Sequence, residues 1–129
     1  MRVCNRSEVE AFVTKDTSTI REILAPRNAP GEIAHQSLAE ASLPPGASTE
    51  PHFHPLTEEI YYILKGEGRM RVRGDVRCVG PGDAIAIPPG APHQITNTSG
   101  DRTLVFLCCC APAYSHEDTV MVSPDGWDG

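Results

Sequence analysis

Apolar residues occur along this chain in short runs, and residues that favour turns separate each run from the next. Short runs bounded by Gly, Pro, Asn, Asp and Ser are typical of β-strands, and no stretch keeps the periodicity of a long helix. Strands are predicted over residues 17–24, 32–43, 52–54, 59–65, 70–73, 76–79, 83–87, 93–97 and 103–110. One helical turn is predicted over residues 7–12, with Ser7 as its N-cap and Glu10 three residues later. The pattern therefore predicts an all-β fold.

Some segments of this pattern also indicate where they lie in the fold. Segment 59–65 is apolar at nearly every position, which predicts a central strand buried on both faces. Segments 70–73 and 76–79 are predicted to form a hairpin around Gly74-Asp75, which accept the positive φ of a two-residue turn. After Pro112 the sequence becomes polar. Residues 113–122 are predicted to lie along the other strands as an edge segment, and residues 123–129 to form a flexible tail.

Length and composition fit one small domain made of strands. The chain has 129 residues, enough for one hydrophobic core, so a single domain is predicted over residues 1–129. Its 11 Gly and 12 Pro, without low-complexity tracts, suit many turns between short strands. Closing such a sheet into a barrel, or pairing it as a jelly roll, removes exposed strand edges.

The charge balance argues against nucleic acid and against a membrane surface as partners. The chain carries 11 basic and 17 acidic residues, a net charge of −6. It has no block of Lys and Arg of the kind that binds phosphates. Arg69, Arg71, Arg73 and Arg77 lie at alternate positions, which predicts the solvated face of the hairpin. No apolar run approaches the ~20 residues of a membrane span.

The cysteines and the first ten residues predict a reducing compartment. Five cysteines are an odd number, three of them are adjacent at positions 108–110, and no CxxC pair is present. Residues 1–10 carry charges throughout and lack the apolar core of a secretory signal. Free thiols in a cytoplasmic protein are therefore expected.

Two stretches of the chain bring together side chains that bind metals. In the first, one residue separates His52 from His54, so on a strand both imidazoles project to the same face. Glu59 follows after a short polar turn. In the second stretch, Pro88-Pro89-Gly90 bends the chain shortly before His93. Histidine nitrogens and a carboxylate oxygen are a usual ligand set for a divalent first-row transition metal.

The spacing of these residues resembles that of the cupin superfamily. The first stretch runs Gly46, five residues, His52-Phe53-His54, four residues, Glu59, six residues and Gly66. The second runs Gly82, five residues, Pro88-Pro89-Gly90, two residues, His93, three residues and Asn97. Every fixed position of the two cupin motifs is filled, and the spacer between them is short. The chain is therefore similar to the small single-domain bacterial cupins.

The resemblance implies a fold, a metal site and an assembly. The fold would be a double-stranded β-helix, or jelly-roll barrel, with a metal-binding core at about residues 35–112 and an N-terminal strand segment at residues 1–34. One divalent ion (Fe, Mn, Ni, Co, Cu or Zn) would be bound by His52, His54, Glu59 and His93. Glu58 is the alternative carboxylate, but the six-residue gap to Gly66 favours Glu59. Pairing through the N-terminal strand 17–24 would make a homodimer.

Strand parity adds residues that would line the same cavity or the core. Tyr61 and Ile63 share the parity of Glu59, and Ile95 shares that of His93. Tyr61 is a candidate catalytic residue, as an acid, a substrate contact or a core side chain. His35, in the strand before the first motif, is the other candidate, as a base near the metal, a pocket residue or a surface histidine.

Two further sets of residues have structural and chemical alternatives. Cys108 and Cys110 should face one way and Cys109 the other, so the first two are pocket thiols or small core residues. Asn97 is expected to hydrogen-bond a loop rather than to contact the metal.

The resemblance favours a metal-dependent enzyme acting on a small organic substrate, of dioxygenase or isomerase/cyclase type, without fixing the reaction. A redox-active ion would bind O2 beside the substrate, whereas a Lewis acid such as zinc would polarise a carbonyl group. A non-catalytic module that binds or senses a small molecule is the alternative, although no DNA-binding helical segment accompanies the barrel. A storage protein is the third class, and the lack of a duplicated barrel argues against it.

Overall fold

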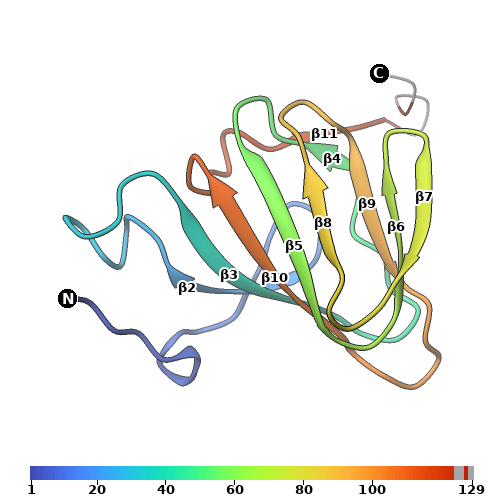
Figure 1. The fold of residues 1–129 in the computed structure, drawn as a ribbon, viewed down its shortest axis with the longest axis horizontal. Coiled ribbons are helices and arrows are strands. Elements are labelled where there is room, and N and C mark those ends of the chain that lie inside the picture. The colour runs from blue at the N-terminus through green and yellow to red at the C-terminus, as the bar shows by residue number, and fades with distance from the viewer. Residues whose placement is uncertain (124–126, 128–129) are drawn as a thin grey trace.

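Two antiparallel β-sheets pack face to face in the computed structural model, which describes residues 1–123 and 127 (Figure 1). The larger sheet contains, in spatial order, β1 (Phe12–Val13), β2 (Thr19–Leu24), β3 (Ser37–Leu43), β10 (Leu104–Ala111), β5 (Glu58–Lys65) and β8 (Ala84–Ile87). The smaller sheet contains β11 (Val120–Met121), β4 (His52–Phe53), β9 (His93–Asn97), β6 (Gly68–Val72) and β7 (Asp75–Val79). This is a jelly roll, so the predicted all-β fold is confirmed. No helix among the described residues has the length and apolarity needed to cross a bilayer.

The core lies between the two sheets and is built from alternate residues of strands such as β3, β5, β9 and β10. In β3 every second residue, from Ser37 to Leu43, is buried, and the side chains between them are half-exposed. The largest fully buried apolar side chains are Phe106, Leu43, Ile63, Ile95 and Leu104. Each such side chain contributes about 1.5–3 kcal/mol by leaving water, so this shared layer holds the sheets together.

Strand β5 differs from its prediction on one face. It is central, because it lies between β10 and β8. Its inner residues Tyr61 and Ile63 are buried, but Ile60 is 50% exposed and Tyr62 and Leu64 are each 40% exposed. The expectation of burial on both faces was therefore wrong. Aromatic and branched side chains favour extended backbone even where no second layer covers them, so composition alone does not distinguish the two cases.

Several predicted boundaries shift by one or two residues, and two predictions before β4 differ by more. β3 begins at Ser37 rather than at residue 32, because Glu32 N–H and Ile33 N–H both donate to the carbonyl of Ala29 and form turns there. The predicted helical turn over residues 7–12 is a shorter 3₁₀ turn, η1 (Arg6–Glu8). Ser7 was the wrong N-cap, because the turn begins earlier and the Asn5 side chain accepts from Ser7 N–H.

The β6–β7 hairpin turns one residue earlier than predicted. Val72 pairs with Asp75, so Arg73 and Gly74 form the loop, and Arg73 has φ +53°. This register places Arg77 opposite Met70 and on its face of the sheet, away from the face of Arg69. The prediction that all four arginines share one face was therefore wrong, and the position of the turn does not change this, because a turn at Gly74-Asp75 would place Arg77 opposite Val72, on the same face as Met70. The Arg77 side chain is 78% exposed.

The last part of the chain returns to the smaller sheet. β11 pairs with β4, with Met121 opposite His52, so the predicted edge segment is confirmed. The predicted flexible tail, residues 123–129, lies outside the described residues except for Ser123 and Trp127.

The turn at Gly66, which joins β5 to β6, packs closely against the start of β10. It has φ +86°, and an added Cβ would lie 2.8 Å from the Thr103 carbonyl oxygen. Gly82 has a similar φ of +91° but no atom within 4 Å of an added Cβ. We expect Gly82→Ala to lower the free energy of unfolding by about 1–2 kcal/mol, the cost of the left-handed backbone alone. Gly66→Ala should cost about 1–3 kcal/mol more, because backbone must also move. Equal losses in urea unfolding would contradict the close packing.

Candidate metal centre

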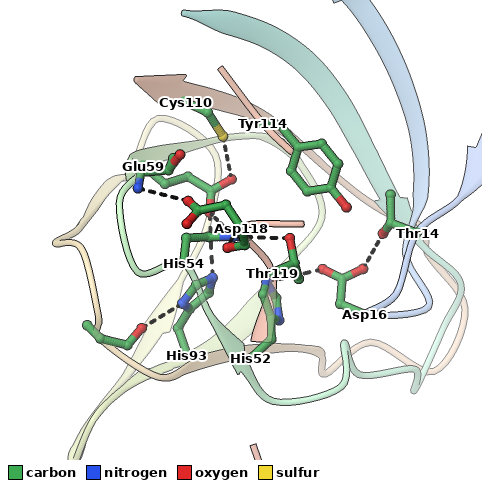
Figure 2. A network of polar contacts seen from close by, with 12 residues as sticks. Thr14, Asp16, His52, His54, Glu59, His93, Cys110, Tyr114, Asp118 and Thr119 are labelled. Carbon is green, nitrogen blue, oxygen red and sulfur yellow. Dashed lines mark hydrogen bonds and ion pairs between the residues drawn. The ribbon is translucent and has the colours of Figure 1, made fainter. Parts of the chain in front are cut away.

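Four buried side chains from both sheets meet at one end of the barrel (Figure 2). His52 lies in β4 and pairs directly with His93 in β9, which places these two imidazoles side by side. His54 follows two residues after His52 and faces the same way. Glu59 reaches the group from β5 of the opposite sheet. The structure therefore brings together all four side chains of the predicted site.

Each imidazole is held by a hydrogen bond to a backbone carbonyl. The Nδ1 atoms of His52, His54 and His93 lie 2.8 Å, 3.1 Å and 2.9 Å from carbonyl oxygens. The carbonyls belong to Glu50, Asp118 and Ala91, respectively. A carbonyl only accepts, so Nδ1 carries the proton in each ring, and Nε2 of the neutral ring keeps its lone pair. This arrangement fixes the ring orientation and leaves three Nε2 atoms available for a cation.

The free atoms of the four side chains converge. One ligand atom from each of His52, His54 and His93 lies within 4.8 Å of the other two. Glu59 Oε1 lies 3.4 Å from His54 Nε2 and 3.5 Å from His93 Nε2. Among the described residues, Glu59 Oε1 and His93 Nε2 are buried atoms without a hydrogen-bond partner. Leaving such atoms unpaired is costly, and a divalent cation between them would satisfy both. The donor set fits a first-row transition metal.

The alternative carboxylate points the other way. Glu58 is exposed, whereas Glu59 is 5% exposed and faces the histidines. Burial alone would raise the pKa of Glu59, but the imidazoles of His54 and His93, 3.4 Å and 3.5 Å from its Oε1, outweigh it and hold the pKa well below its usual range. Glu59 is therefore ionised and supplies one negative charge to the centre.

The histidines differ in their electrostatic surroundings. Burial, with the neighbouring His93, lowers the pKa of His52 to about 4. Burial also lowers the pKa of His54, but the neighbouring carboxylate of Glu59 raises it by more, so its pKa is raised overall. His52 is thus neutral at pH 7, the form that binds a metal.

A cavity opens beside the four side chains, and both Cys108 and Cys110 line it. The Cys110 thiol donates to Glu59 Oε2 at 3.1 Å, and burial raises its pKa, so the sulfur stays protonated. Cys109 is exposed on the outer face. The predicted parity is confirmed, and the two inward thiols are pocket residues.

The two candidate catalytic residues have different placements. Tyr61 is 2% exposed, lines the cavity, and lies edge-on to His93 with a centroid distance of 5.9 Å. Its ring also packs on Phe106 at 4.7 Å, so it belongs to both core and site. His35 lies exposed in the segment before β3, outside the set of residues that line the cavity. The side-chain amide of Asn97 donates to the carbonyls of Leu43 and Arg102, so the prediction that Asn97 hydrogen-bonds a loop is confirmed.

Asp16 and Tyr114 are among the cavity residues that the sequence did not single out. Asp16 comes from the loop before β2, and Tyr114 from the segment after β10. Tyr114 lies edge-on to His54 with a centroid distance of 6.0 Å. Neither residue lies in a motif, and only the packing of both chain ends against the barrel brings them to the site.

The low pKa of His52 predicts a pH dependence for the metal-free protein. The unfolded chain, with a pKa near 6.5, binds the His52 proton at a higher pH than the folded chain does. The stability due to neutral His52 is therefore complete above pH 6.5 and is lost as the pH falls toward 4. In urea unfolding with EDTA, we expect stability to fall between pH 7 and pH 4.5, and to fall by about 2 kcal/mol less in His52→Gln. Exposed His35→Gln is the control; equal slopes in all three would contradict this.

The chain resembles several known proteins along much of its length. It is 48% identical over 112 residues to an uncharacterized protein, MJ1618, of Methanocaldococcus jannaschii, with 87% of each chain covered. It is 42% identical over 69 residues to the oxalate-binding protein of Thermotoga maritima, covering 54% of this chain and 56% of that one. The polyketide cyclase RemF of Streptomyces resistomycificus has a similar structure, with a TM-score of 0.77 and 27% identity. That alignment covers 99% of this chain and 91% of RemF.

The family assignment rests on the central strands and both histidine stretches. A family profile described as "Cupin domain" matches residues 39–110, more than half of the chain. The matched region runs from β3 to β10 and contains His52, His54, Glu59 and His93. The resemblance drawn from motif spacing is confirmed, and the chain belongs to the cupin domain family.

Proposed function

We propose that this cupin is a metal-dependent enzyme that acts on a small organic substrate. One divalent transition metal ion would be held by His52, His54, His93 and Glu59. The observation that carries the proposal is the meeting of three locked imidazoles beside an unpaired buried carboxylate oxygen, Glu59 Oε1, which lies 3.4 Å and 3.5 Å from the Nε2 atoms of His54 and His93. Four protein ligands leave positions open on a six-coordinate ion, which catalysis requires and a closed structural site lacks.

The residues around the centre determine what the cavity can bind. A bound ion would supply Lewis acidity, polarising an oxygen of the substrate. The cavity lining includes apolar groups such as Ala41 and Phe106 and polar groups such as Ser18 and Asp16. No Lys or Arg is among the lining residues of the described chain. An anionic group of a substrate would therefore depend on the ion for its charge partner.

Two observations support proton-transfer chemistry of the isomerase/cyclase type over dioxygenase chemistry. Hydroxyl, thiol and carboxyl groups line the cavity, so proton donors and acceptors lie close to the metal position. The structural relative RemF is a polyketide cyclase by name. A non-catalytic binding module is the second candidate, supported by the similarity to a protein named for binding oxalate.

Metal content tests the ligand assignment. We expect His93→Ala and His52→Ala to reduce bound metal from about one ion per chain, measured by inductively coupled plasma mass spectrometry. Both variants should also lose the rise in melting temperature that added metal gives the parent protein, because an ion that binds only the folded chain stabilises it. His35→Ala, which removes an exposed imidazole, should keep both properties. Unchanged metal content in the two site variants would reject the assignment.

The reaction class can be tested without knowing the natural substrate. Protein reconstituted with Zn²⁺, Mn²⁺ or Fe²⁺ is incubated in D2O with small hydroxy and keto acids. We expect deuterium to enter a C–H position next to a carbonyl, detected by NMR, because a polarised carbonyl makes that proton acidic.

The controls of this experiment separate the alternatives. His93→Ala protein should give no exchange. O2 consumption without exchange would favour the dioxygenase class. Binding of these acids by the metal-loaded protein with neither exchange nor O2 consumption would favour the binding module.

A further inference from the structure

The loop before β2 delivers a carboxylate to the cavity in a fixed orientation. Asp16 Oδ1 accepts three hydrogen bonds, from Thr14 Oγ1 at 2.6 Å, Ser18 Oγ at 2.6 Å and Ser18 N at 3.0 Å. The loop itself closes through a bond from Thr17 N–H to the Thr14 carbonyl. Thr17 has φ +73°, an unfavourable backbone for a branched residue, so the loop conformation is imposed by its contacts. One oxygen of Asp16 is thus fully used in holding the side chain still.

The second oxygen of Asp16 faces the metal position (Figure 2). Asp16 Oδ2 lies 3.6 Å from His52 Nε2, the atom available to a cation, and it accepts no hydrogen bond from the described residues. His52 cannot donate to it, because the Nδ1 proton goes to the Glu50 carbonyl and Nε2 would be bound to the ion. The acceptor therefore has no protein partner once an ion is present.

Glu50 fixes the position of Asp16 relative to His52, because its backbone forms a hydrogen bond with each of them. Glu50 N–H donates to the Asp16 carbonyl at 2.7 Å, while the Glu50 carbonyl accepts from His52 Nδ1 at 2.8 Å. On the other side of the loop, Lys15 Nζ donates to the carbonyls of His116 and Thr119. Asp16 is therefore held between the first histidine stretch and the last segment of the chain, and a small shift of the loop would disrupt several bonds at once.

We propose that Asp16 Oδ2 accepts a hydrogen bond from a hydroxyl group of the substrate, beside the atom that the metal binds. This inference rests on the proposed function, since it takes the ion as the first anchor of the substrate. It narrows the substrate class to small acids or carbonyl compounds with a hydroxyl group next to the metal-binding oxygen. The ion binds the anionic or carbonyl end, which no Lys or Arg of the cavity can do, and Asp16 selects for the hydroxyl group.

Two probes, one with a hydroxyl proton and one with a methyl group in its place, test the inference. Co²⁺-loaded protein is titrated with glycolate, which has a hydroxyl group, and with methoxyacetate, in which that proton is replaced by a methyl group. Binding is followed by the visible absorption of Co²⁺, which reports on ligands at the metal without any turnover. We expect the parent protein to prefer glycolate by about tenfold or more, the scale of one hydrogen bond to a charged group.

The variants isolate the contribution of Asp16 to that preference. Asp16→Asn retains an oxygen that can accept from Thr14 and Ser18, so the loop should stay in place, and Asp16→Ala removes the group. In both variants the preference for glycolate should fall at least fivefold relative to the parent, with Co²⁺ content and the ligand-free spectrum unchanged. Glu10→Gln, which removes one negative charge from an exposed position of the same N-terminal segment, should keep the parent preference.

The outcomes distinguish this inference from the proposed function. If the parent protein binds neither Co²⁺ nor either acid, the proposed function itself fails, and this inference with it. If the parent binds both acids but the preference is absent or survives in the two Asp16 variants, only the role of Asp16 is overturned. A changed ligand-free Co²⁺ spectrum in both variants would make Asp16 a metal ligand and would also overturn the proposal.

Discussion

Three hydrogen bonds from imidazole Nδ1 atoms to main-chain carbonyls determine what this site can be. They set the tautomer of His52, His54 and His93 and direct three Nε2 lone pairs to one place. Main-chain acceptors are well suited to this, because their positions follow from the fold and do not depend on side-chain rotamers. The buried oxygen of Glu59 can share an ion with the histidines, and the cavity can hold a substrate beside that ion, only because these rings are held in place.

The jelly roll supplies the carbonyls from three different parts of the chain. Ala91 belongs to the turn ahead of β9, Glu50 precedes β4, and Asp118 lies in the final segment ahead of β11. Glu59 comes from the opposite sheet, so the site bridges the two layers of the barrel. The core below, with Phe106 and Ile63, fixes the separation of the sheets and so the distance between carboxylate and histidines.

The sequence located the four side chains of the candidate metal centre, but it did not place His35 outside the cavity or indicate that Asp16 lines it. The alternation of side chains along a strand is a local property, so the shared face of His52 and His54 could be predicted. The choice of Glu59 over Glu58 came instead from the spacing of the cupin motif. The hairpin turn moved by one residue because Arg73 accepts a positive φ in the folded chain, which composition does not reveal. Asp16 reaches the cavity through contacts with residues far away in sequence, and no short motif encodes such contacts. The exposure of Tyr62 could not be predicted either, because burial of the outer face of β5 depends on whether a second layer covers it.

The final segment has a consequence for how the chain end and the centre influence each other. The Asp118 carbonyl holds His54, the Asp118 carboxylate accepts from the amides of Leu56 and Thr57, and β11 pairs with β4. An ion that requires His54 in this orientation therefore favours the docked segment, and by thermodynamic reciprocity the docked segment strengthens ion binding by the same factor. A molecule that binds residues 115–122 in their docked position would thus raise the affinity for the ion, and one that displaces them would lower it, without contacting any ligand atom.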